Sequence, residues 1–207
     1  MQKYSLTIIL FFSISLIIIA GYLIINLSPI DKKKAGVSSS IVYNQAPSLG
    51  GEFSLINVDT AKEISTALFR GKLLLVYFGY SYCPDICPME LGKISVVMDE
   101  LGGMKDKVQP LFITVDPARD TIDHMKNYIK SFSPELIGLT GTKEQIDKAT
   151  SLYKVYYAKD ANSNKNNYLI NHSSFIYLMD KEGKYLAHFD IKVDSATMLK
   201  VIRKHLQ

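Results

Sequence analysis

The sequence predicts an α/β sandwich built on a mixed central β-sheet, and three observations support this fold class. Residues 73–78 are all apolar, as in a central strand that is covered on both faces. Further along the chain, segments whose apolar residues have the spacing of a helix alternate with segments whose apolar residues have the spacing of a strand. Finally, two short apolar runs are joined by Asp180-Lys181-Glu182-Gly183, which is typical of a hairpin. Alternating strands and helices followed by a hairpin indicate a sheet with both parallel and antiparallel strands, covered by helices.

Each element of this domain has its own signal in the sequence. The strand at 72–78 ends at Gly79, and the helix that starts near Pro88 has apolar residues three and four positions apart before Gly102-Gly103 stops it. Thr142 and Gln145 have the spacing of a capping box, which predicts the start of another helix. The same periodicities predict strands at 111–115, 174–179 and 184–189, and helices at 120–130 and from 194 or 195 onward.

A long apolar segment precedes the domain. From residue 6 to residue 27 every residue is apolar or small and uncharged, except Tyr22 and Asn26. At about 1.5 Å per residue this run spans roughly 33 Å, enough to cross a bilayer core of about 30 Å. We therefore expect one transmembrane helix within residues 1–30, kept as an anchor rather than removed as a signal peptide. A polar tether should follow at 31–45, and the folded domain at 46–207.

The charges argue against nucleic acid as a partner, and they leave open which side of the membrane the domain lies on. The chain has 24 basic and 20 acidic residues, a net charge of +4. Four Lys and one Asp lie within residues 1–34, so the remainder has 20 basic and 19 acidic residues. That balance offers no basic surface for nucleic acid. Lys32–34 after the apolar segment, against Lys3 before it, favour a cytoplasmic domain, although long domains translocate despite such charges.

The chemistry of the sequence is concentrated in its two cysteines. Both lie in the segment Cys83-Pro84-Asp85-Ile86-Cys87-Pro88, between the apolar strand and the first helix. Pro88 suits the first position of a helix, so we expect Cys87 to be the N-cap, where free N–H groups and the helix dipole favour a thiolate. Such a pair can close a disulfide or bind a soft metal. A purely structural disulfide is the alternative.

Two thiolates leave a metal site incomplete, and an imidazole would complete a site for Cu(I) or Cu(II). Of the four histidines, His172 is the strongest candidate, because it follows the polar stretch 159–167 and directly precedes an apolar strand. Loops at strand ends commonly carry ligands. The other three have structural interpretations: His124 on a helix surface, His188 within a strand, and His205 in the last helical turn, where a cation complements the dipole.

Several segments in order resemble the Sco/SenC family of copper-binding, thioredoxin-like proteins that serve cytochrome c oxidase assembly. The matching segments are residues 50–55, 71–80, 83–88, 112–121, 138–142 and 172–180. The resemblance implies a thioredoxin-like fold and one copper bound by Cys83, Cys87 and His172. It also implies delivery of copper, or of reducing equivalents, to the copper-bearing subunit of the oxidase. It places the domain in the periplasm, against the lysine count, and the bacterial inner membrane is preferred because no Arg- and Ser-rich transit segment precedes the anchor.

The sequence departs from the family beside the third candidate ligand, where Asn171 stands in place of the Asp of many relatives. A carboxylate that could orient the imidazole is therefore absent. Asp116 and Asp120 have two interpretations of equal weight: they shape the copper site or partner docking, or they form a turn and a helix N-cap. Of Tyr80 and Tyr82, which flank the thiols, we expect one to pack and one to be solvated.

Two functional classes remain open. The first is a metallochaperone, a binding protein without turnover. The second is a thiol–disulfide oxidoreductase that reduces the cysteines of a copper-site partner. Thioredoxin-like enzymes usually have two residues between their cysteines, whereas this chain has three, which favours chelation. A thiol peroxidase is a weaker alternative, because it gives Cys87 and His172 no shared role. One anchor and one domain predict a monomer.

Overall fold

The computed structural model describes residues 49–163 and 168–207. The predicted anchor at 6–27 and tether at 31–45 lie outside these residues, as do the first few residues of the predicted domain. Within the part of the chain that is described, no helix is both long and apolar enough to cross a membrane. The membrane segment therefore stays a prediction from the sequence.

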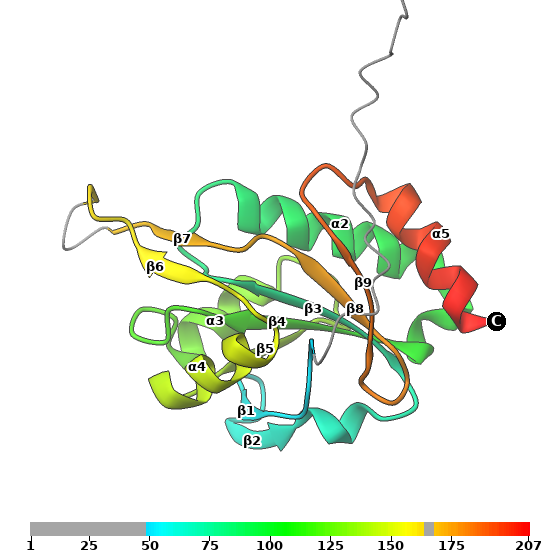
Figure 1. The fold of residues 1–207 in the computed structure, drawn as a ribbon, viewed down its shortest axis with the longest axis horizontal. Helices are drawn as coiled ribbons and strands as arrows, with labels where there is room; N and C mark the ends of the chain where they lie inside the picture. The colour runs from blue at the N-terminus through cyan, green and yellow to red at the C-terminus, as the bar shows by residue number, and fades with distance from the viewer. Residues whose placement is uncertain (1–48, 164–167) are drawn as a thin grey trace, which may run out of the picture. The chain divides into compact units, whose positions relative to one another are not determined.

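A mixed β-sheet forms the centre of the domain (Figure 1). Its seven strands are β1 Ser54–Asn57, β2 Lys62–Ser65, β3 Leu73–Gly79, β4 Val108–Thr114, β5 Ile137–Thr140, β8 Ile176–Met179 and β9 Tyr185–Phe189. Their order across the sheet is β2-β1-β5-β4-β3-β8-β9. β4 runs parallel to β3 and to β5, whereas β8 is antiparallel to β3 and β1 is antiparallel to β5. The predicted mixed sheet is confirmed.

Helices cover both faces of this sheet. In the described residues the α-helices are α2 Ile86–Leu101, α3 Ile122–Ile129, α4 Lys143–Leu152 and α5 Ser195–Leu206. α2 packs against α5, whereas α3 lies against β5 and α4 against β1. Figure 1 shows α2 and α5 along the top of the domain and α3 and α4 at its left. This cover explains why every residue of β3 is buried, as its apolar sequence predicts.

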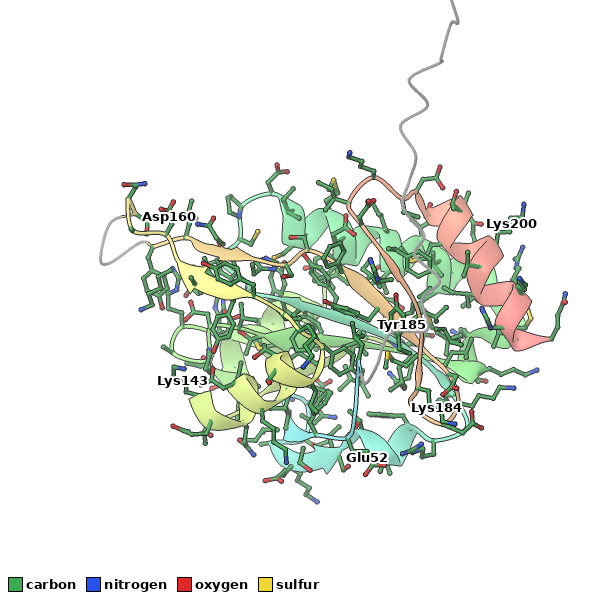
Figure 2. The ribbon with its side chains drawn as sticks, viewed as in Figure 1. Glu52, Lys143, Asp160, Lys184, Tyr185 and Lys200 are labelled. Carbon is green, nitrogen blue, oxygen red and sulfur yellow. The ribbon has the colours of Figure 1, made fainter. Side chains whose placement is uncertain are left out.

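A two-stranded arm stands apart from the main sheet. Its strands, β6 Tyr157–Lys159 and β7 Ile170–His172, pair only with each other. Figure 1 shows the arm reaching out from the body, and Figure 2 places Asp160 near its outer end. There the Asp160 N–H donates to the Leu169 carbonyl oxygen at 2.8 Å. The sequence does not predict the arm, because three-residue strands are too short to show an alternating pattern.

The start of α2 corrects one prediction. The helix begins at Ile86, so Cys87 is its second residue and Asp85 is the N-cap. The Asp85 side chain makes no capping hydrogen bond. Instead, the Cys87 N–H donates to Cys83 Sγ at 3.4 Å. Pro88 fits the third helical position as well as the first, because no N–H in the first turn has a partner within the helix.

Two further boundaries differ from the prediction. β4 begins at Val108 rather than Leu111. Its first three residues, Pro110 included, pair with β3 alone, since the pairing with β5 starts at Leu111. Pro110 therefore lies where β4 is still an edge, the place where a strand accepts proline. The N-cap of α3 is Thr121, whose hydroxyl accepts from a backbone N–H, and not Asp120. Asp120 is completely buried instead.

Candidate metal centre

Cys83, Cys87 and His172 converge just beyond the end of β3. Their sulfur and ring nitrogen atoms all lie within 4.8 Å of one another. Cys87 Sγ is 3.4 Å from His172 Nε2, and both thiols are free. In residues 49–163 and 168–207, no other group of three or more His, Cys, Asp or Glu side chains lies close enough to hold a metal ion.

Cys83 lies on the turn between β3 and α2, where backbone groups hold it. Its N–H donates to the Tyr80 carbonyl oxygen at 3.2 Å, and its sulfur accepts from the Cys87 N–H. The sulfur thus takes the capping role that a side-chain oxygen usually has at a helix N-terminus. Because the dipole and the free N–H groups attract negative charge there, this place favours a thiolate. Cys83 is half-buried, whereas Cys87 is completely buried.

The pKa values of the two thiols are shifted in opposite directions. The pKa of Cys83 is lowered to about 3, chiefly by its hydrogen bond with Cys87 and further by hydrogen bonds with His172 and backbone N–H groups, against the opposing effect of burial. The pKa of Cys87 is raised by the same bond with Cys83 and by burial. The two shifts have opposite directions, so the half-buried sulfur of Cys83 is the favoured place for a negative charge in the pair.

His172 ends β7 and so lies in a strand, not in the loop that the sequence predicts. Its Nδ1 is 3.1 Å from the Ser173 carbonyl oxygen, which can only accept, so Nδ1 carries a proton and Nε2 faces Cys87. The rings of Tyr77 and Tyr80 contact the imidazole edge-on, with centroids 6.3 and 5.9 Å away. The ring is thus oriented without the carboxylate that Asn171 replaces.

Tyr80 joins the arm to the turn that carries Cys83. It is buried, whereas Tyr82 is 44% exposed, so one packs and one is solvated as predicted. The Tyr80 hydroxyl accepts a hydrogen bond from the Ile170 N–H at 3.1 Å, two residues before His172. A side chain that directly follows β3 therefore fixes the strand that presents the imidazole.

Asp120 fastens the turn before Cys83 to the end of β4. Its buried carboxylate accepts from the Ser81 N–H at 3.0 Å, from the Ser81 hydroxyl, and from Thr114 Oγ1 at 2.6 Å. Burial raises the pKa of Asp120, and these hydrogen bonds oppose the rise. Asp120 thus shapes the turn beside the thiols from inside the protein.

Asp116 anchors a second group beside the site. It belongs to a turn, as predicted, and pairs with Arg119 Nε at 2.5 Å and with the Tyr168 hydroxyl at 2.7 Å. The Arg119 guanidinium lies 3.6 Å from the centre of the Tyr168 ring and 4.8 Å from that of Tyr82. Neither Arg119 nor Tyr168 is predicted from the sequence as part of the site. The only available signal was the closeness of Arg119 to Asp116 along the chain.

The other three histidines lie outside the cluster. His124 is exposed and stacks on Tyr82, with ring centroids 4.7 Å apart. His188 lies within β9, and its Nδ1 is 2.7 Å from the Tyr185 hydroxyl. His205 is in the last turn of α5. All three positions agree with the structural interpretations given by the sequence.

Fold and site together define a class of protein: a thioredoxin-like α/β domain in which two sulfurs and one imidazole lie close together, a set of groups that suits a soft metal. The chain belongs to the SCO1/SenC family, which it matches over residues 42–207. The family resemblance seen in the sequence is therefore confirmed.

Individual relatives agree with this assignment. A SCO2-like protein of Rickettsia prowazekii is 38% identical over 204 residues, which cover 98% of each chain. A copper-bound structure of Bradyrhizobium japonicum ScoI is 38% identical with a TM-score of 0.70, over 76% of this chain and 99% of that one. A copper-bound structure of yeast Sco1 is 40% identical with a TM-score of 0.71, over 77% and 89%.

Proposed function

We propose that this protein is a copper metallochaperone. It binds one copper ion through Cys83, Cys87 and His172 and supplies it to the copper-bearing subunit of cytochrome c oxidase. The convergence of the two sulfurs and the imidazole nitrogen within 4.8 Å carries the proposal. Copper as the metal is supported by solved relatives that hold copper, among them those at 38% and 40% identity described above. The oxidase as the destination is supported by membership of the family.

The arrangement suits an ion that is held and then passed on. Thiolate sulfur is the ligand that Cu(I) prefers, and imidazole serves both Cu(I) and Cu(II). The half-buried position of Cys83 leaves one side of the ligand set reachable from solvent. A partner's ligands can therefore approach on that side while Cys87 stays in the core.

A thiol–disulfide oxidoreductase is the second candidate function. A half-exposed thiol of lowered pKa beside a buried thiol is the usual arrangement of an attacking and a resolving cysteine. Thiol exchange gives the Nε2 of His172 no necessary part, although this atom faces Cys87. The two functions therefore differ in whether His172 is needed.

We place the domain on the periplasmic side of a bacterial inner membrane, anchored through residues 6–27, as a monomer. The match to a bacterial relative over 98% of both chains supports this placement, whereas Lys32–34 argue against it.

An alkaline phosphatase fused after Gln207 should be active in intact cells, because that enzyme folds only after export. An inactive fusion of normal abundance would assign the domain to the cytoplasm.

Titration of the reduced full chain in detergent with Cu(I), and separately with Cu(II), tests the proposed function. We expect one copper per chain that withstands gel filtration and moderate chelators. The variant with both cysteines changed to Ser should hold none, because hydroxyls bind Cu(I) poorly. Equal copper on the double variant would exclude this site. Absence of copper from the wild type, with unimpaired thiol exchange, would favour the oxidoreductase.

Gly79 provides the space for the buried sulfur. A methyl group at this position would lie 2.9 Å from Cys87 Sγ, 3.0 Å from Phe112 and 3.1 Å from Tyr77. Since these neighbours belong to a close-packed core, they cannot all withdraw. The last residue of β3 must therefore lack a side chain if Cys87 is to reach its place.

We expect Gly79→Ala to move the Cys87 sulfur and to weaken Cu(I) binding about tenfold, at a cost of about 1–3 kcal/mol in the free energy of unfolding. Chelator competition and urea unfolding measure the two effects. Gly92→Ala is the matched control, because Gly92 lies in α2 with open space around its Cα. The control should keep its copper affinity and gain up to about 1 kcal/mol. Equal affinities of both variants would show that the sulfur does not depend on Gly79.

A further inference from the structure

Tyr77 lies against two of the three groups of the metal centre. It is completely buried in the middle of β3. A carbon placed on Gly79 would lie 3.1 Å from Tyr77 Cε1 and 2.9 Å from Cys87 Sγ, so the ring edge and the sulfur border the same small space. The same ring contacts His172 edge-on. Tyr77 therefore borders the centre from the buried core.

The hydroxyl of Tyr77 has no hydrogen-bond partner among the described residues, although it is buried. An unpaired hydroxyl in the core is costly, so a buried orphan of this kind calls for an explanation. Its surroundings point to one: Cε1, the ring carbon next to the one that bears the hydroxyl, faces the space that Cys87 Sγ borders, and after burial the charge of Cys87 raises the pKa of Tyr77 most. The hydroxyl therefore lies at the edge of the ring that borders the sulfur.

Glu90 is the competing acceptor for this hydroxyl. It lies one turn after Cys87 in α2, and its Oε2 is also buried without a partner among the described residues. Its Oε1, however, pairs with Lys93 Nζ at 2.7 Å, and the influence of Glu90 on Tyr77 is smaller than that of Cys87. A metal-bound sulfur is a thiolate and so a better acceptor than a thiol. Metal binding therefore favours the sulfur as the partner.

We propose that Tyr77 is a positioning residue for the copper centre, whose hydroxyl donates a hydrogen bond to Cys87 Sγ when that sulfur holds copper. This inference rests on the proposed function. A hydrogen bond to a ligating sulfur fixes its orientation and withdraws electron density from it. Because such bonds tune the potential of copper–thiolate and iron–sulfur sites, the hydroxyl favours Cu(I) over Cu(II).

The Tyr77→Phe variant of the full chain tests this role, because it removes only the hydroxyl. We expect Cu(I) affinity to fall about 10- to 100-fold, the range for lost partners of metal ligands. The sulfur-to-Cu(II) charge-transfer absorption should move to longer wavelength, since the sulfur keeps more of its electron density. The melting temperature of the copper-free protein should not fall, because the hydroxyl has no partner there. Tyr128→Phe is the matched control: its hydroxyl is also buried and unpaired among the described residues, and the charge of Cys87 and Cys83 raises its pKa after burial, but its ring packs on Phe112 and Phe132.

Three outcomes would overturn the inference. The first is unchanged affinity and absorption in Tyr77→Phe. The second is an equal change in Tyr128→Phe, which would reflect general core polarity. The third is an equal loss in Glu90→Gln with an unshifted absorption in Tyr77→Phe, which would make the carboxylate the partner. A wild type that binds no copper would overturn the proposed function as well, and that result is distinct because it appears before any variant is made.

Discussion

Replacing His172 with alanine should weaken Cu(I) binding by at least about 100-fold, while thiol–disulfide exchange at Cys83 and Cys87 stays within about twofold of the wild type. Loss of a ligand should cost at least as much as loss of a group that merely orients one, which is 10- to 100-fold. The fold should persist, because the backbone pairing of β7 and its bond to Tyr80 do not involve the imidazole. Chelator competition and the rate of reaction with a small disulfide measure the two effects.

His124→Ala is the matched control for this substitution. His124 is exposed and only stacks on Tyr82, so its removal should leave both copper affinity and thiol exchange unchanged. Unaltered copper affinity in His172→Ala would remove the imidazole from the site and leave the oxidoreductase as the better interpretation. Parallel loss of copper binding and thiol exchange would show instead that His172 acts on both thiols.

Replacing Asp120 with alanine should lower the free energy of unfolding by about 3 kcal/mol. The substitution leaves the Ser81 N–H and the Thr114 hydroxyl without their acceptor in a buried place, and each unsatisfied group costs about 1–3 kcal/mol. For a domain of this size, the melting temperature should fall by about 6–12 °C. Copper affinity should also fall, because the turn that carries Cys83 loses its attachment to β4.

Two comparisons separate this network from a general effect of charge. Asp123→Ala removes an exposed carboxylate from the first turn of α3 and should change stability by less than about 0.5 kcal/mol. Asp120→Asn keeps one acceptor oxygen and should fall between the wild type and Asp120→Ala. Equal stability of Asp120→Ala and Asp123→Ala in urea unfolding would contradict the attachment described here.

Elements with strong local signals are predicted well from the sequence. The capping box of Thr142 and Gln145 is present as expected, with both reciprocal hydrogen bonds. Asp194 caps α5 through its side chain, and β8 and β9 form the expected hairpin. In each case the residues that determine the structure lie within a few positions of one another, so a single segment contains the information.

The missed features depend on distant parts of the chain. β5 is four residues long and is recognisable only from its pairing with β4 and β1. Asp120 acts on Ser81, 39 positions away, and nothing near Asp120 in the sequence indicates this. The position of Cys87 within α2 was mispredicted because a sulfur, that of Cys83, caps the helix in place of the usual oxygen.

In the candidate site, too, some residues are predictable from the local sequence and others depend on distant segments. The cysteines are identifiable from their spacing and their place before a helix, whereas the imidazole comes from a strand 85 positions after Cys87 that has no strand signal of its own. Its place before an apolar strand makes His172 the strongest candidate among the four histidines, and the family resemblance then implies its role as a ligand. The sequence gives no sign of a polar role for Tyr77, because this residue lies within an apolar run that predicts only a buried side chain.

The separation of the arm from the main sheet has a mechanical consequence. Both sulfurs belong to the body of the domain, whereas the nitrogen is carried by β7, which pairs only with β6. An ion bound by the two sulfurs and the imidazole nitrogen would link the arm to the body of the domain. A partner that pulled the arm aside would reduce the coordination number from three to two while the spacing of the sulfurs stayed the same. Binding of such a partner would thus be enough to release the ion, without unfolding of the domain or a change in its redox state.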